Sequence, residues 1–171
     1  MNRKLLIMMA ALPAIASVCA TALASPAVDA FNADGMERIL ARERGRPFVL
    51  LLWSLDCTFC HASMKNLATA QNREGFDVAA VAIETADDPA NAAAISAATS
   101  QLGKNTSVWA FGDEAPERLR YLVDPAWHGE LPRSYWYDAM GQRLAAHSGL
   151  ITPSYIVEVR HKITGEPASS E

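Results

Sequence analysis

One stretch of the sequence decides the fold: Pro47-Phe-Val-Leu-Leu-Leu-Trp53-Ser-Leu-Asp56-Cys57-Thr-Phe-Cys60-His61. An apolar run of strand length ends in a polar turn, and two cysteines in the spacing C-x-x-C follow at the start of a predicted helix. The free N–H groups and the dipole at a helix start stabilise a thiolate, which makes Cys57 the predicted nucleophile. Cys60, one turn further along, is the predicted resolving thiol. The sequence therefore predicts a reactive dithiol.

The N-terminus has the three parts of a secretory signal peptide. Arg3 and Lys4 are followed by an apolar segment and then by the small residues that precede Ser25. We predict that residues 1–24 are a signal peptide, cleaved after Ala24, and that the protein is exported to the periplasm. An uncleaved membrane anchor and lipidation at Cys19 are the alternatives.

Length and charge limit the classes of function. The sequence has 171 residues, with 15 Lys and Arg against 19 Asp and Glu. Cleavage would leave about 147 residues, the size of one domain, which we expect to be a monomer. It would also remove Arg3 and Lys4, for a net charge of about −6 that argues against nucleic acid as a partner. The two cysteines that remain, Cys57 and Cys60, close too small a loop to brace the fold, so a redox or metal role is expected.

The hydrophobic pattern alternates between strands and helices, which predicts an α/β domain over residues 31–164. A flexible leader is expected at 25–30 and a disordered tail at 165–171. Near-continuous apolar runs indicate strands buried on both faces of a central mixed sheet flanked by helices. The predicted helices are 31–43, the segment after the cysteines to about 73, 89–102, 114–122 and 154–163. The predicted strands are 48–53, 76–84, 106–111 and the hairpin of 131–137 with 142–148.

Two motifs in this order resemble the thioredoxin superfamily, and within it the exported TlpA/ResA-like thiol-disulfide oxidoreductases. Trp53-Ser-Leu-Asp-Cys57-Thr-Phe-Cys60 resembles the family's W-x-x-x-C-x-x-C, and Glu130-Leu131-Pro132 with the following hairpin resembles its cis-proline segment. The resemblance implies a thioredoxin-like fold with a βα region inserted between the C-x-x-C half and the hairpin. It also implies that Pro132 is cis and lies against Cys57, and that Leu131, Pro132 and Trp53 bind the client.

The sequence departs from the family pattern beside the cysteines. Asp56 stands where a second tryptophan is usual, and we expect its charge to raise the pKa of Cys57. Ser63 and Lys65 replace a common Glu and a kinking Pro. With the usual proton-relay carboxylate missing, Glu84 or Glu130 is a candidate substitute, and a solvated strand-end charge is the other interpretation. His61 is expected on the rim of the site, where its cationic form would favour the thiolate.

Two other interpretations of the cysteines remain open. Cys57-Thr-Phe-Cys60-His61 matches the C-x-x-C-H signature of c-type haem attachment, with Met64 or Met140 as a further axial ligand. Alternatively, the two thiols bind copper(I), with His128 or His147 recruited to the site. Because the motif follows a buried strand, we favour the oxidoreductase, which needs no metal or other cofactor.

The predicted activity is reduction of disulfides in client proteins by the Cys57–Cys60 dithiol. An exported reductant also requires a membrane-bound thiol electron donor as its second partner.

Overall fold

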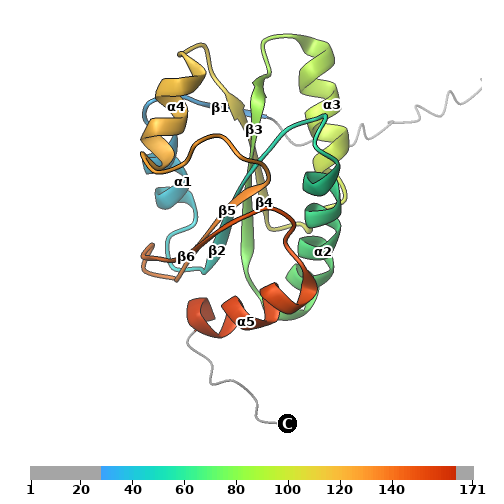
Figure 1. The fold of residues 1–171 in the computed structure, drawn as a ribbon, viewed down its shortest axis with the longest axis vertical. Helices are drawn as coiled ribbons and strands as arrows, with labels where there is room; N and C mark the ends of the chain where they lie inside the picture. The colour runs from blue at the N-terminus through green and yellow to red at the C-terminus, as the bar shows by residue number, and fades with distance from the viewer. Residues whose placement is uncertain (1–27, 165–171) are drawn as a thin grey trace, which may run out of the picture.

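A computed structural model of the chain describes residues 28–164. Its centre is a six-stranded sheet with the order β1-β4-β3-β2-β5-β6 (Figure 1). Four strands are parallel: β1 (Asp29–Phe31), β4 (Thr106–Phe111), β3 (Asp77–Thr85) and β2 (Phe48–Trp53). The hairpin of β5 (Arg133–Tyr137) and β6 (Arg143–Ser148) continues the sheet, with β5 antiparallel to β2. The sheet is therefore mixed, as the sequence predicts.

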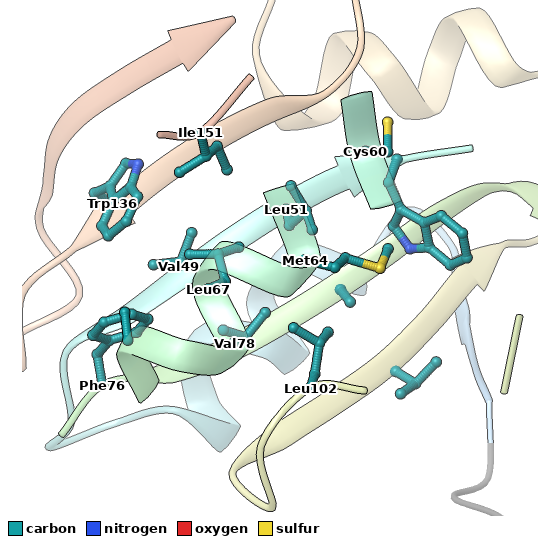
Figure 2. Packing of buried hydrophobic residues seen from close by; sticks show 14 of the residues in the cluster. Val49, Leu51, Cys60, Met64, Leu67, Phe76, Val78, Leu102, Trp136 and Ile151 are labelled. Atoms are coloured by element: carbon teal, nitrogen blue, oxygen red, sulfur yellow. The ribbon is translucent and has the colours of Figure 1, made fainter. Parts of the chain in front are cut away.

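Helices cover both faces of the sheet (Figure 1). One face carries α2 (Thr58–Glu74), α3 (Pro89–Thr99) and α5 (Pro153–Thr164), and the other carries α1 (Gly35–Arg42) and α4 (Pro116–Val123). All six residues of β2 are buried, with Val49 and Leu51 facing the first group of helices and Leu50 and Leu52 facing the second. This alternation, with period two, gives the domain two hydrophobic cores. Figure 2 shows the first of them, in which Met64 and Leu67 of α2 pack onto the sheet.

The predicted architecture is confirmed. The additional βα region lies between the C-x-x-C half and the hairpin, and its strand β4 enters the sheet between β3 and β1. The helix and strand boundaries differ from the predicted ones by a few residues, as at α3, which ends at Thr99 rather than at residue 102.

The start of the domain corrects the sequence analysis. Residues 29 and 30, predicted to belong to a flexible leader, form β1 together with Phe31, which was predicted to begin a helix. Their partners are in β4, where Phe31 pairs with Phe111. The first helix begins only at Gly35, where a Cβ atom would lie 2.5 Å from the Phe31 ring. Such a short strand depends on a partner 80 residues away, so no local pattern announces it.

Some predictions fall outside the described residues. These are the signal peptide at 1–24, the first residues of the leader and the tail at 165–171. Within residues 28–164, no helix is both long enough and apolar enough to cross a membrane.

Candidate active site

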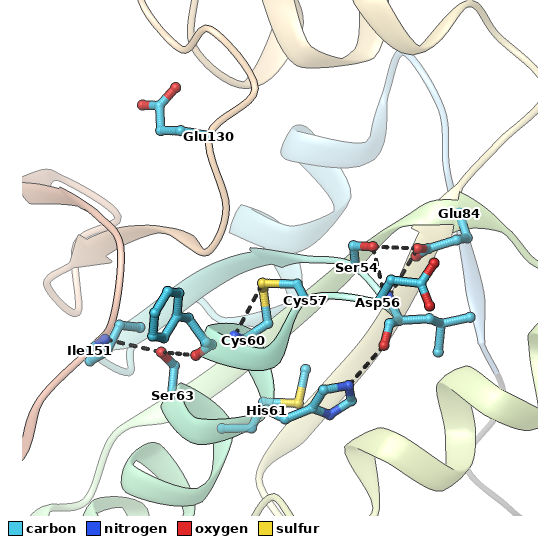
Figure 3. The surroundings of a disulfide bond; sticks show 12 residues. Ser54, Asp56, Cys57, Cys60, His61, Ser63, Glu84, Glu130 and Ile151 are labelled. Atoms are coloured by element: carbon cyan, nitrogen blue, oxygen red, sulfur yellow. Dashed lines mark hydrogen bonds between the residues drawn. A yellow bond between two sulfur atoms is a disulfide. The ribbon is translucent and has the colours of Figure 1, made fainter.

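A disulfide joins Cys57 and Cys60 at the carboxyl end of β2, with an S–S distance of 2.03 Å (Figure 3). Cys57 is the N-cap residue of α2, so the helix begins one residue later than the first cysteine. Its Sγ accepts a hydrogen bond from the backbone N–H of Cys60, 3.1 Å away. Cys57 is half-buried, whereas Cys60 is fully buried. Of the two cysteines, Cys57 is therefore the one that solvent reaches more easily.

The peptide bond between Leu131 and Pro132 is cis, as the resemblance implies. It lies just before β5, whose first residue, Arg133, pairs with Leu52 near the end of β2. The proline is therefore at the same end of the sheet as the disulfide. Pro132 is buried and Leu131 is half-buried.

No protein-family model matches the chain, and no curated protein does either. Solved structures do match. A secreted disulfide oxidoreductase of Mycobacterium tuberculosis, homologous to E. coli DsbE, is 18% identical, with a TM-score of 0.51 over 72% of this chain and 84% of that one. An exposed lipoprotein thioredoxin of Streptococcus pneumoniae is 19% identical, with a TM-score of 0.53 over 72% and 89% of the two chains.

A secreted thiol-disulfide isomerase of Corynebacterium glutamicum is 13% identical, with a TM-score of 0.59 over 74% of this chain and 75% of that one. The chain has a thioredoxin-like fold. The C-x-x-C disulfide and the cis-proline occupy one end of the sheet in this fold.

Glu84 holds Ser54 and Leu55, the part of the W-x-x-x-C-x-x-C motif that precedes the cysteines. It comes from β3, the strand beside β2, and its Oε1 accepts hydrogen bonds from Ser54 Oγ at 2.7 Å and from the N–H of Leu55 at 2.9 Å (Figure 3). Its second oxygen, Oε2, is buried and has no hydrogen-bond partner in the described part of the chain. No ion pair involves Glu84 among residues 28–164. Of the two predicted relay carboxylates, Glu84 is the one in direct contact with the motif.

His61 and Trp53 support the same segment from the other side. His61 Nε2 lies 2.9 Å from the carbonyl oxygen of Leu55, so this nitrogen carries the hydrogen (Figure 3). Its ring meets the Trp53 ring edge-on, with 6.0 Å between centroids. Trp53 is fully buried. The prediction that Trp53 binds the client by direct contact is therefore corrected, because its side chain belongs to the core and supports His61.

Two polar residues of α2 hold the loop between β6 and α5. Ser63 Oγ accepts a hydrogen bond from the N–H of Ile151 at 3.0 Å and donates one to the carbonyl of Phe59 at 2.7 Å. Asn66 Nδ2 donates to the carbonyl of Ile151 at 2.9 Å. The same loop reaches the cis-proline, since the N–H of Gly149 donates to Pro132 O at 2.8 Å. This link was not predicted, and its signal in the sequence is a polar pair on a largely apolar helix face.

Glu130 faces a different set of partners. Its Oε1 accepts a hydrogen bond from Ser148 Oγ at 2.7 Å and lies 3.5 Å from Arg133 Nη1, and its carboxylate points away from the disulfide in Figure 3. Desolvation acts to raise the pKa of Glu130, but the hydrogen bond from Ser148 and the charge of Arg133 outweigh it and lower the pKa. Glu130 thus contacts neither the cysteines nor residues 53–60, and its role as a proton-relay carboxylate stays a prediction.

A buried polar network fixes the segment before the cis-proline. Asp124 Oδ2 accepts hydrogen bonds from Tyr135 Oη at 3.0 Å and Arg133 Nη2 at 3.4 Å, and it lies 3.3 Å from Arg143 Nη1. Both guanidinium groups lie over the Tyr135 ring, 4.8 and 5.2 Å from its centroid. Desolvation opposes ionisation of Asp124, but these partners and the N–H of Ala126 lower its pKa. Burial raises the pKa of Tyr135 to about 12. No sequence pattern predicted this network.

The residues named for haem or copper binding are scattered. Met64 is in the core, and Met140 is 85% exposed in the β5–β6 turn at the opposite end of the sheet. His61 Nε2, a candidate axial ligand atom, is bonded to a carbonyl. His147 stacks on Tyr155, with 4.2 Å between ring centroids. Residues 28–164 contain no group of three or more His, Cys, Asp or Glu side chains arranged to hold a metal ion.

Proposed function

We propose that the protein is a periplasmic thiol-disulfide oxidoreductase that reduces disulfides in client proteins. The observation that supports this most is the unequal exposure of the two cysteines, with Cys57 half-buried at the start of α2 and Cys60 fully buried in its first turn. In such a pair the accessible thiol attacks the client and the buried thiol completes the reaction. The predicted signal peptide at 1–24 supports export to the periplasm.

The reaction is two successive exchanges. The Cys57 thiolate attacks one sulfur of the client disulfide, the client S–S bond breaks, and the second client sulfur leaves as a thiolate that takes up a proton. Cys60 then loses its proton and attacks Cys57 Sγ, which releases the first client sulfur. Two electrons have passed to the client, and the Cys57–Cys60 disulfide has formed. A dithiol protein in the membrane is proposed to reduce it again.

Two features of the site support binding of an extended client segment. Leu131 and Pro132 precede β5 and lie outside its pairing with β2, so we propose that the backbone of Leu131 receives the client. Ser63 and Asn66 fix the loop on the other side of the proline through Ile151. The client would thus meet the Cys57 sulfur between two loops that the protein holds in place.

Asp56 supports the reducing direction. It is exposed, follows the segment held by Glu84, and has no ion pair within residues 28–164. A carboxylate beside Cys57 disfavours the thiolate, and therefore the reduced, ionised form of the pair. A less stable reduced form makes the dithiol a stronger reductant.

Trapping of mixed disulfides tests the proposal. In cells that export the protein, Cys60→Ser should accumulate covalent complexes with clients that dissolve on addition of dithiothreitol, because the second exchange cannot occur. Cys57→Ser should trap at least about tenfold less, and the double variant should trap none. The proposal fails if Cys57→Ser traps as much as Cys60→Ser, or if neither variant forms complexes.

A further inference from the structure

The charges of the domain are divided between the two ends of the sheet. We call the end at which β2 meets α2 the disulfide end; there β1 to β4 finish, β5 begins and β6 finishes (Figure 1). Its loops, residues 32–34, 54–57, 86–88, 112–115, 124–132 and 149–152, contain no Lys or Arg. They contain eight acidic residues: Asp34, Asp56, Asp87, Asp88, Asp113, Glu114, Asp124 and Glu130.

The loops at the opposite end have a different composition. Residues 43–47, 75–76, 100–105 and 138–142 carry three cationic side chains, those of Arg44, Arg46 and Lys104, against the acidic Glu43 and Asp138. Among the loops, the acidic character therefore belongs to the disulfide end.

Part of this acidity is neutralised inside the protein. Asp124 and Glu130 are paired with Arg133, and Glu114 is paired with Arg118. The carboxylates without an ion pair within residues 28–164 include Asp56 and, from β3 and the loop that follows it, three more. These three are Glu84, Asp87 and Asp88.

The strand order places the unpaired carboxylates at the disulfide end on the strand next to β2, where Glu84 contacts Ser54 and Leu55. β3 is the immediate neighbour of β2: Trp53, the last residue of β2, pairs with Ala82 about 5 Å away, and β3 continues for three more residues to Thr85. The end of β1, which leads to Asp34, is three strand positions away from β2 in the sheet, or about 14 Å. Asp87 and Asp88 are both exposed, and Asp88 uses one oxygen to cap α3 through the N–H of Ala90. Negative charge is therefore concentrated on the β3 side of Cys57.

Acidic residues alone do not make a binding surface, but here they border a reactive group that must meet another protein. Phe59, between the two cysteines, is 62% exposed and offers an apolar contact beside them. A client that docks on Cys57 brings the residues next to its own disulfide over this border. Opposite charges there accelerate encounter, and like charges suppress it.

We propose that the border formed by Asp56, Glu84, Asp87 and Asp88 selects clients whose disulfide is flanked by Lys or Arg. This inference rests on the proposed function and adds the chemical class of the client. The preference acts on the encounter with Cys57, so it should be measured as a difference in the second-order rate constant. This difference should become smaller as the ionic strength rises, because added salt shortens the range of charge interactions.

Three synthetic peptides with the same central disulfide loop test the proposal. Two residues on each side of the loop are Lys in the first, Gln in the second and Glu in the third. The rate constant for oxidation of the reduced mature protein is measured by stopped flow at ionic strengths of about 10 mM and about 500 mM, between which the screening length falls from about 30 Å to a few Å. We expect the Lys peptide to react at least about tenfold faster than the Glu peptide at low salt, and about twofold faster at high salt.

Paired variants locate the effect. In Asp87→Asn/Asp88→Asn, in which Asn keeps the helix cap, the low-salt ratio of the Lys to the Glu peptide should fall about threefold. Glu37→Gln/Glu158→Gln, with the same change in net charge on α1 and α5, should keep the wild-type ratio. Equal rates for the three peptides at low salt, or an equal fall in both variants, would overturn this inference and leave the proposed function standing. If none of the peptides oxidises the reduced protein, the proposed function falls and the inference with it.

Discussion

The carboxylates on the two sides of the disulfide differ in what balances them. On the β5 side, Asp124 and Glu130 are bound by Arg133, and Asp124 by Arg143 as well. On the β3 side, Glu84 is held only by neutral donors and Asp56 has no ion pair among the described residues. Both groups approach the same end of the sheet, but only the first carries its own counter-charges.

This difference separates structural from functional charge. A carboxylate enclosed by guanidinium groups fixes backbone, and here that backbone leads into the cis-proline. A carboxylate without a cation leaves a negative field for the thiolate and for an approaching client. The two sides should therefore respond differently to loss of charge.

The largest expected effect is on the β5 side. Asp124→Asn should lower the free energy of unfolding at pH 7 by about 2–3 kcal/mol, because Arg133 and Arg143 lose their common partner and Arg133 is only 15% exposed. The pKa of Asp124 is lowered in the folded state, so its contribution is present above the ordinary value of 3.8 and is lost as the pH falls through the folded-state pKa. Urea denaturation at pH 7 and near pH 3 should show the difference from wild type narrowing in acid.

Glu158→Gln is the matched control for Asp124→Asn. Glu158 is exposed and, within residues 28–164, forms an ion pair with the exposed Lys162 on α5, so its neutralisation should change the stability by about 0.5 kcal/mol or less. A loss in Asp124→Asn no greater than this, or a loss that is the same at both pH values, would mean that Asp124 is not the anchor of the cis-proline segment.

The next effect is on the β3 side and concerns Glu84. Glu84→Ala leaves the N–H of Leu55 and the hydroxyl of Ser54 without their acceptor, which should cost about 1–2 kcal/mol and loosen the approach to Cys57. Glu84→Gln keeps the Oε1 acceptor, so it should retain the wild-type rate with the Gln peptide within about threefold. Stopped-flow rates with that peptide compare the two variants. A Gln variant as slow as the Ala variant would assign Glu84 a role as proton carrier, one of the two interpretations that the sequence leaves open.

Much of the fold is predictable from the sequence because its signals are local. Buried strands such as Phe48–Trp53 are continuous apolar runs, and the C-x-x-C and Leu131–Pro132 motifs mark the two sides of the site. β1 was missed because three residues carry no periodicity and depend on pairing with β4.

The contacts of the site residues were not predictable for a similar reason. Glu84 and Glu130 have equivalent positions in the sequence, each near an end of a strand, and only tertiary contacts separate them. Glu84 reaches the motif, whereas Arg133 and Ser148 hold Glu130. In the same way, Asp124 gains its role from residues of β5 and β6. Ser63 and Asn66 act through Ile151, more than 80 residues away, so no spacing rule identifies them.

Among the single substitutions, Asp56→Asn should have the smallest effect. It changes the reduction potential of the Cys57–Cys60 pair, which is also the quantity that tests the proposed reductase activity most directly. Equilibration of the Cys57–Cys60 pair with glutathione redox buffers gives its reduction potential. We predict a value nearer the about −270 mV of thioredoxin than the about −120 mV of DsbA. Asp56→Asn should raise the potential by about 20–30 mV, because the thiolate of Cys57 no longer faces an adjacent negative charge. A wild-type potential above about −170 mV, near or above that of protein disulfide isomerase, would contradict the reductase assignment and favour an oxidase or isomerase.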